Sequence, residues 1–263
     1  MGIVNLTDNS YFSSSRCLDG DGLPDRESFL AAVRAHVCGG AEIIDLGACS
    51  SRPGAVPVSA EQEWSRLEPA LDLIKRYMPD VRISIDTFRS GIVRKAFEIV
   101  GSFMVNDISA GEDDELMLPT VAELELPYVA MHKRGTSETM QQMTRYDDVV
   151  EEVLQYFRDF SLKAEKAGVR DWILDPGFGF AKTIDQNYEL LAGLGRFRSL
   201  GRRILVGVSR KSMIYSLLGI TPEEALPATQ VLHLKALQGG ASILRVHDSA
   251  EAARTVEIWK KLG

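Results

Sequence analysis

The sequence predicts an α/β fold in which parallel strands close into one (β/α)8 barrel, a single domain over residues 1–263. Short β-branched apolar segments alternate strictly with longer segments of helical periodicity, and such alternation produces parallel strands joined by right-handed crossovers. The unit repeats about eight times. A doubly wound open sheet usually has fewer strands, and roughly 250 residues is the ordinary length of such a TIM barrel. The composition does not change along the chain in a way that would mark a second domain.

Local signals place the elements along the chain. We predict strands at residues 2–6, 42–47, 81–86, 104–108, 128–132, 172–175, 204–208 and 243–246. Helices are expected at residues 26–38, 59–77, 91–99, 146–167, 185–194 and 250–262, with two more that end before Pro127 and before Gly239. Ser59 with Gln62 has the pattern of a capping box, which begins a helix, and Gly168 is typical of a helix end.

The balance of charge limits the partners of the protein. The formal net charge at pH 7 is −7, so the bulk surface repels nucleic acid and anionic lipid, and we expect neither as a partner. The apolar runs are much shorter than the ~20 residues that a membrane helix needs. The three cysteines stand apart without metal or redox spacing, which indicates free thiols in a reducing compartment. We therefore expect a cytoplasmic protein, in which an anionic substrate needs a local cationic pocket.

Polar residues recur at the C-terminal ends of the predicted strands, where side chains point into the mouth of a barrel. They are Asn5, Asp45, Asp86, Asn106 with Asp107, His132, Asp175, residues 209–211, Arg245 and His247. Each of them alone is more often a helix cap or a turn residue, since Asp, Asn and Ser favour those positions. Their occurrence on most of the strands favours a functional site at this end of the barrel.

The residue types describe a ligand with two chemically different ends. The carboxylates of Asp86 and Asp175 and the amide of Asn106 can complement a planar heterocycle with adjacent amino, ring N–H and carbonyl groups. After Asp175, glycines allow close approach of the backbone, and phenylalanines at 178 and 180 can enclose a flat ring. Cationic side chains that suit a phosphate or a carboxylate complete the set. They are Arg52, Lys211, Arg245 and His247.

Eight segments resemble the dihydropteroate synthase family, in the family's order and over nearly the whole chain. They are residues 1–7, 44–47, 51–55, 84–87, 106–108, 175–180, 207–212 and 245–248, among them Ser-Ile-Asp-Thr, Asp-Pro-Gly-Phe-Gly-Phe and Ser-Arg-Lys-Ser. The family condenses 6-hydroxymethyl-7,8-dihydropterin diphosphate with 4-aminobenzoate, and it releases 7,8-dihydropteroate and diphosphate. Sulfonamides block this step. The resemblance therefore implies a transferase of folate biosynthesis that binds these small molecules.

The resemblance also implies roles for individual residues. It assigns the pterin ring to Asp86, Asn106, Asp175 and Lys211. It assigns the diphosphate to Asn5, Arg245 and His247, with Asn5 as the ligand of an accompanying Mg²⁺ ion. The aminobenzoate side comprises Ser51, Arg52, Pro53, Phe180 and Ser212. The expected catalytic residues are Lys211, Asp175, Arg245 and Asp8. A homodimer formed through the late helices is implied as well.

The chain departs from the family's pattern mainly in its first loop. The two usual aspartates of that loop fall on Asn9 and Ser13, and Asp8 stands beside the first. We expect Asp8 to carry part of their role, by binding Mg²⁺ or by steadying developing positive charge. In the second loop, Ser51 stands where the family usually has Thr, which keeps the hydroxyl and loses a methyl group.

Two other functions fit parts of the pattern. A methyltetrahydrofolate-type methyltransferase domain shares the Asp and Asn contacts with a pterin, but it does not need the cations of residues 209–211 and 245–247. A catalytically silent pterin-binding homologue would explain the changed first loop. The number of matching segments favours the synthase over both.

Overall fold

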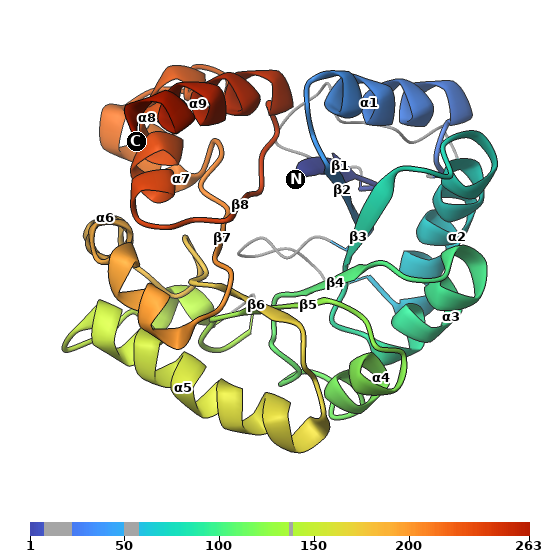
Figure 1. The fold of residues 1–263 in the computed structure, drawn as a ribbon, viewed down its shortest axis with the longest axis horizontal. Coiled ribbons are helices and arrows are strands. Elements are labelled where there is room, and N and C mark those ends of the chain that lie inside the picture. Colours follow the sequence, from blue (N-terminus) through green and yellow to red (C-terminus); the bar gives the residue numbers. More distant parts are fainter. Residues whose placement is uncertain (8–22, 50–57, 137–138) are drawn as a thin grey trace.

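Eight short strands ring the centre of the computed structural model, which describes residues 1–7, 23–49, 58–136 and 139–263 (Figure 1). They are β1 (Gly2–Asn5), β2 (Ile43–Gly47), β3 (Arg82–Asp86), β4 (Met104–Asp107), β5 (Tyr128–Met131), β6 (Trp172–Asp175), β7 (Leu205–Val206) and β8 (Ile243–Leu244). β1 to β6 pair in sequence order as a parallel sheet, and β7 pairs in parallel with β8. Bridges between Leu174 and Ile204 and between Gly2 and Val246 close the ring. The predicted barrel is confirmed.

Helices cover the outside of the barrel (Figure 1). They are α1 (Arg26–Cys38), α2 (Ala60–Tyr77), α3 (Ser90–Val100), α4 (Met117–Glu123), α5 (Val149–Ala167), α6 (Ile184–Ala192), α7 (Ser212–Leu218), α8 (Leu226–Gln238) and α9 (Ser249–Leu262), with 3₁₀ segments η2 (Met140–Gln142) and η3 (Leu194–Leu200). α1 and α9 lie side by side, so the outer ring closes as well. Ser59 and Gln62 form the predicted capping box, and Gly168 ends α5.

The segment between β7 and β8 differs from the prediction. One helix was expected before Gly239, but the chain forms both α7 and α8 there. α7 ends at Gly219, whose φ of +65° lies in the left-handed region that glycine adopts without strain. Thr221 then accepts from and donates to Glu224, which fixes a turn before α8. The helix stop at Gly219 was missed because the apolar pattern continues on both sides of it.

Inward-pointing side chains give the barrel an apolar lower half and a polar mouth. The lower half contains a small buried cluster of Met104, Val129, Ile173 and Leu205. Two residues further along β4 and β6, the next inward positions are Asn106 and Asp175, because side chains alternate along a strand. On β4 and β6, the inward-pointing polar side chains therefore lie at the C-terminal ends of the strands.

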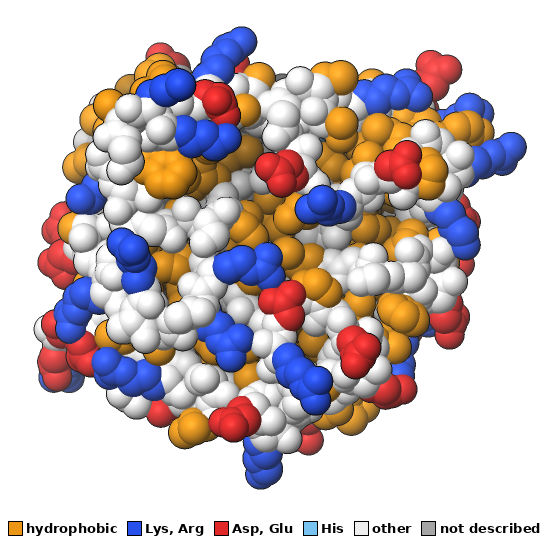
Figure 2. All heavy atoms as spheres, viewed as in Figure 1, with side chains coloured by type: hydrophobic (Ala, Val, Ile, Leu, Met, Phe, Trp, Pro, Cys, Tyr) orange, Lys and Arg blue, Asp and Glu red, His pale blue; other side chains and the backbone are white. Residues whose placement is uncertain are grey.

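The outward side chains of the strands form the main core beneath the helices. Trp172 of β6, for example, packs against Phe157 and Phe160 of α5. On the outer surface, basic and acidic side chains are interspersed over the face seen in Figure 2. Within the described ranges, no helix combines the length and apolar character that crossing a membrane requires.

Candidate active site

The strand register brings polar side chains to one level at the mouth of the barrel. Asn5 pairs with Gly47, Gly47 pairs with Asp86, and Asp86 pairs with Asn106. Further around the ring, the end of β6 carries Asp175. A Cβ atom on Gly47 would lie 3.6 Å from Asn5 Oδ1 and 3.7 Å from Asp86 Oδ2. The amide of Asn5 and the carboxylate of Asp86 therefore converge above this glycine.

Arg245, which follows β8, links the acidic side chains of β2 and β3. Its Nε donates to Asp45 Oδ2 over 2.7 Å, and its Nη2 donates to Asp86 Oδ2 over 2.8 Å. Asn106 Nδ2 also donates to the Asp45 carboxylate, at 3.3 and 3.4 Å from its two oxygens. Because an ionised carboxylate only accepts, this contact orients the amide and leaves Asn106 Oδ1 to accept from a ligand. We call Asp45, Asp86, Asn106 and Arg245 the arginine cluster.

Burial controls the ionisation of the arginine cluster. The side chain of Asp45 is fully buried, and that of Asp86 is 14% exposed. Burial raises the pKa of Asp86 to about 7, with the charge of Arg245 opposing the rise and that of Asp45 adding to it. Burial alone would lower the pKa of Arg245, but the two carboxylates raise it above its usual value. Ligand N–H groups that donate to Asp86 would favour its ionised form.

The loop after β6, residues 175–182, carries the second group of predicted residues, and we call it the Gly-Phe loop. Asp175 Oδ1 accepts from the backbone N–H of Gly177 over 2.8 Å. Burial raises the pKa of Asp175, and the charge of Lys211 opposes that rise. Gly177 has a φ of +71°, and a Cβ atom there would lie 1.9 Å from the carbonyl oxygen of His132. Only glycine fits this close approach of the two chain segments.

Two lysine side chains bind the backbone of the Gly-Phe loop. Lys182 Nζ donates to two of its carbonyls, over 2.9 and 3.0 Å. Lys211 Nζ donates to Phe178 O and lies 4.9 Å from the centre of the Phe180 ring. Burial lowers the pKa of Lys182 to about 7 and that of Lys211 to about 8, although Asp175 opposes both shifts. Lys211 therefore lies close to both Phe178 and Phe180 of the loop that begins at Asp175.

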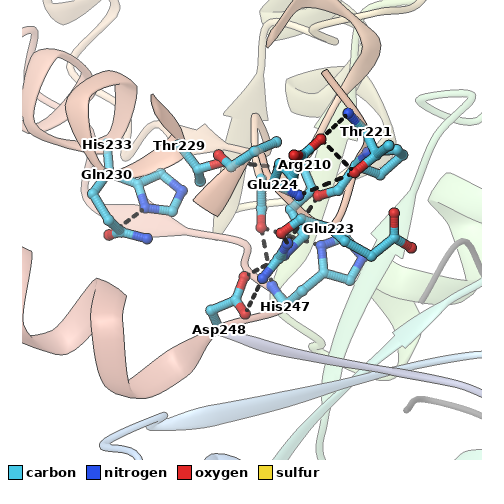
Figure 3. A network of polar contacts seen from close by, with 12 residues as sticks. Arg210, Thr221, Glu223, Glu224, Thr229, Gln230, His233, His247 and Asp248 are labelled. Carbon is cyan, nitrogen blue, oxygen red and sulfur yellow. Dashed lines mark hydrogen bonds and ion pairs between the residues drawn. The ribbon is translucent and has the colours of Figure 1, made fainter. Parts of the chain in front are cut away.

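Arg210 ties the loop after β7 to the loop after β8, as Figure 3 shows. Its Nε and Nη2 each lie 2.8 Å from a carboxylate oxygen of Asp248, and its Nη1 donates to two backbone carbonyls of the turn before α8. Beside it, the N–H and Nδ1 of His247 lie 3.2 and 3.1 Å from Ser209 Oγ. The charge of Arg210 is thus paired inside the protein, and Arg210 holds the loops that carry Lys211 and His247.

These groups surround a cavity of about 570 Å³ at the mouth. Its lining includes Asn5, Asp86, Phe180, Lys182, Lys211, Ser212, Arg245 and His247. Asn106 and Asp175 are buried and do not line it. A larger hollow of about 870 Å³ lies near Met1 and α9, but it has none of the predicted residues in its lining. We therefore assign the site to the cavity at the mouth because of its lining residues, although the other hollow is larger.

The described part of the chain brings the predicted residues together, and their binding roles remain predictions. Asp8, Ser51, Arg52 and Pro53 lie outside the described residues. Sequence reasoning passed over two residues of the site. Asp45 had a signal as a polar strand end, but its partner Arg245 is 200 positions away. Lys182 had no signal, because no spacing pattern indicates which backbone carbonyls a lysine will reach.

Comparisons with known proteins agree with this geometry. A family model described as pterin binding enzyme matches residues 1–247. The chain is 39% identical to the dihydropteroate synthase of Escherichia coli strain K12, over 98% of this chain and 90% of that protein. It is 38% identical to the dihydropteroate synthase of a Synechocystis strain, over 98% of this chain and 88% of that protein.

Two solved structures show the same likeness. The dihydropteroate synthase of Yersinia pestis in a sulfonamide drug complex has a TM-score of 0.90 at 31% identity, with 99% of this chain and 92% of that chain covered. The Xanthomonas albilineans dihydropteroate synthase with 4-aminobenzoic acid has a TM-score of 0.87 at 36% identity, with 99% and 91% covered.

Proposed function

The chain belongs to the dihydropteroate synthase family of pterin-binding enzymes, and we propose how its own residues carry out the condensation of that family. The substrates are 6-hydroxymethyl-7,8-dihydropterin diphosphate and 4-aminobenzoate. One observation carries the proposal: a single cavity is lined by the carboxylate of Asp86 at the end of β3, by the Gly-Phe loop, and by the cations that follow β7 and β8. The carboxylate suits the donor edge of a pterin, and the cations suit a diphosphate.

The pterin ring would bind between the arginine cluster and the Gly-Phe loop. Asp86 and Asp175 are placed to accept from its amino and ring N–H groups, and Asn106 Oδ1 is oriented to accept as well. Lys211 would give up its contact with Phe178 O and donate to the ring's acceptors. Burial keeps water away from these contacts, which strengthens them.

The reaction exchanges one bond at the pterin methylene carbon. The amine nitrogen of aminobenzoate forms a bond to this carbon, and the bond between this carbon and the diphosphate oxygen breaks. The amine proton passes to water. Positive charge grows on the pterin methylene as the diphosphate departs, and the carboxylates of Asp175 and Asp86 stabilise it. Arg245 and His247 would hold the departing anion. The amine needs no strong base, since its lone pair is available at neutral pH.

We propose Mg²⁺ as the ion that accompanies the diphosphate, with Asn5 as its protein ligand. Among the described residues, no group of three or more His, Cys, Asp or Glu side chains could hold a metal ion. Asn5 nevertheless fits, because Mg²⁺ commonly takes only one or two protein oxygens and completes its shell with phosphate oxygens and water. The ion would supply charge neutralisation of the leaving group.

Solved structures of related enzymes support the second substrate. Members of the family bind 4-aminobenzoic acid, pteroic acid and a sulfonamide drug. We propose the same subsite here and expect sulfonamides to compete with aminobenzoate for it. Phe180 and Ser212 line the cavity on this side. The other expected members of the subsite, residues 51–53, lie outside the described residues.

Release of diphosphate tests the function directly. Purified protein with Mg²⁺ and both substrates should release one diphosphate per dihydropteroate formed, and neither substrate alone should give release. Tight pterin binding without release would indicate the catalytically silent homologue. Methyl transfer from methyltetrahydrofolate without use of the diphosphate would indicate the methyltransferase alternative.

The same assay tests the expected role of Asp8, which lies outside the described residues. Asp8→Ala should lower turnover well beyond its effect on pterin binding, because stabilising developing charge is a transition-state role. Steady-state kinetics beside calorimetry of a bound pterin separate the two effects. An active wild type with an unchanged variant would leave Asp8 as a turn residue.

We also propose a cytoplasmic homodimer. Leu217 and Leu218 of α7, Val231 of α8 and Ile258 of α9 are more than half exposed. Apolar side chains of this size are common at interfaces between subunits. Light scattering of the purified protein measures the oligomeric state, and a monomer at working concentrations would contradict this assignment.

A further inference from the structure

Lys182 is a buried lysine to which the proposed reaction assigns no role. Its side chain lies just before α6, only 4% of its surface is exposed, and it lines the cavity. Removing an ammonium group from water is strongly unfavourable unless its donors find partners. We therefore expect a buried lysine in the wall of an active site to have a specific role.

All three donors of the Lys182 ammonium have acceptors. Nζ lies 2.9 Å from Gly177 O, 3.0 Å from Phe180 O and 3.0 Å from His132 Nδ1. Burial keeps the pKa of His132 well below its usual value, and the charge of Lys182 lowers it further, so the ring is neutral and Nδ1 accepts. In the ammonium form, each donor of Lys182 is thus directed at a protein atom.

The two carbonyls that Lys182 holds are three residues apart in the Gly-Phe loop. Between them, the N–H of Gly179 donates to Asn187 Oδ1 over 2.7 Å, and the N–H of Phe180 donates to Gly177 O over 3.1 Å. The first carbonyl belongs to the residue whose N–H binds Asp175. The second belongs to the residue whose ring faces Lys211. Lys182 thus helps to fix the distance between the Gly177 and Phe180 carbonyls within the loop.

Lys211 holds the same loop in a different way. It reaches Phe178 O from the start of α7, after β7, and in the proposed complex it releases that carbonyl when it binds a pterin. Lys182 has no such second task. The contacts of Lys182 with the loop can therefore persist while a pterin binds.

We propose that Lys182 is a positioning residue that places the Phe180 ring, and through it the aminobenzoate half of the site. Its partner His132, directly after β5, supplies a neutral acceptor and ties the loop to the barrel. The pterin half depends less on Lys182, because Asp86 and Asn106 are held by the arginine cluster. The identity of the ligand rests on the proposed function.

Two probes separate the halves of the site. Pteroic acid occupies both halves, and pterin-6-carboxylic acid occupies only the pterin half. In Lys182→Met, which keeps the approximate length of the side chain and removes its donors, the affinity for pteroic acid should fall about 10- to 100-fold, because the carbonyls of Gly177 and Phe180 both lose the Lys182 donor. The affinity for pterin-6-carboxylic acid should fall less than about threefold. Calorimetry measures both.

Kinetics give an independent readout. Lys182→Met should raise the KM for aminobenzoate far more than the KM for the pterin diphosphate. Lys182→Gln retains an N–H₂ donor and should restore part of the aminobenzoate affinity, and it replaces the methionine variant if that variant does not fold. Lys163→Met is the matched control, because the Lys163 side chain on α5 is 58% exposed and pairs with Glu112 at 3.7 Å, at the surface.

Several results overturn the proposal. Equal losses for the two probes would mean general damage to the barrel, and no loss for either would mean that Lys182 does not place Phe180. Wild-type protein that fails to bind pteroic acid also overturns it. Wild-type protein that binds pteroic acid but releases no diphosphate would refute the proposed function alone, and the comparison of the two probes would still decide on Lys182.

Discussion

The arginine cluster and the Gly-Phe loop build the two sides of one cavity by different means. In the arginine cluster, side chains on β2, β3, β4 and after β8 hold one another, with Arg245 between Asp45 and Asp86. In the Gly-Phe loop, side chains hold backbone groups, with Lys182 and Lys211 on three carbonyls. The first arrangement depends on strand register, whereas the second depends on the path of a loop.

This difference predicts which property a substitution will change. Removing one member of a buried ion pair leaves the other charge buried without compensation. Substitutions in the arginine cluster should therefore lower the free energy of unfolding. Side chains that shape a loop should control affinity and selectivity, since the barrel beneath remains intact. Each of the following predictions tests one side against the other.

Arg245→Met should have the largest effect on stability. It leaves the carboxylates of Asp45 and Asp86 buried without their cation, and breaking a buried pair in this way costs about 3–5 kcal/mol of unfolding free energy. Urea unfolding measures the loss. The matched control is Arg203→Met, because Arg203 pairs with Asp171 at the surface with both side chains about half exposed. Such surface pairs contribute about 1 kcal/mol or less. Equal losses in the two variants would contradict the role given to the cluster.

The contributions of Asp86 and Lys182 to the free energy of unfolding should change with pH in opposite directions. The pKa of Asp86 is raised to about 7, so its contribution to the ligand-free protein is present below pH 4 and is lost as the pH rises to 7. The pKa of Lys182 is lowered to about 7, so its contribution is present near pH 10 and is lost as the pH falls to 7. Each slope is at most about 1.4 kcal/mol per pH unit.

Difference measurements isolate these two contributions. The unfolding free energy of the wild type minus that of Asp86→Asn should decrease from pH 4 to pH 7. The same difference for Lys182→Met should increase from pH 7 upward. Urea unfolding at several pH values gives both curves, and two curves of the same sign would show that burial does not set these ionisations.

Asp175→Asn should weaken pterin binding with little loss of stability. A carboxylate accepts two hydrogen bonds from an amino-pyrimidinone edge, whereas an amide offers one acceptor and one mismatched donor. The expected loss is about 1.5–3 kcal/mol, or roughly 10- to 100-fold in affinity. Calorimetry with pterin-6-carboxylic acid measures it, and Asp171→Asn at the surface is the control. Equal affinities for variant and wild type would remove Asp175 from the site.

Much of the fold and part of the site could be predicted from the sequence. The alternation of strands and helices and the polar residues at strand ends are local patterns, which the sequence shows directly. Because the strands are parallel and in register, their ends lie at one level of the barrel. Asp86, Asn106 and Asp175 therefore lie at the same end of the barrel. Pairings over long separations are not local patterns. For that reason the sequence did not indicate that Asp45 holds Arg245.

Loop geometry escaped prediction for a related reason. Arg210 was grouped with the strand-end polar residues, yet its guanidinium pairs with Asp248 and two carbonyls. Lys182 reaches carbonyls whose directions follow from the positive φ of Gly177 and from the path of the loop. Gly219 divides a helix that the apolar pattern joined. These features depend on backbone conformation, which residue type alone specifies only weakly.

The smallest expected effect belongs to His247→Ala, which tests the anion corner between the two sides. His247 lines the cavity, and its Nδ1 contacts Ser209 Oγ at 3.1 Å, so its ring is oriented by the loop that Arg210 holds. One lost hydrogen bond to the diphosphate should lower affinity by about 1 kcal/mol, or roughly fivefold. Calorimetry of diphosphate with Mg²⁺ measures this change. Ser209→Ala removes the contacts of Ser209 Oγ with the N–H and the ring of His247 but keeps the ring itself, so it should give a smaller loss, while Asp175→Asn should give none. Unchanged diphosphate binding in His247→Ala would assign His247 to the turn before α9, and Arg245 would then remain as the predicted diphosphate contact at this end of the barrel.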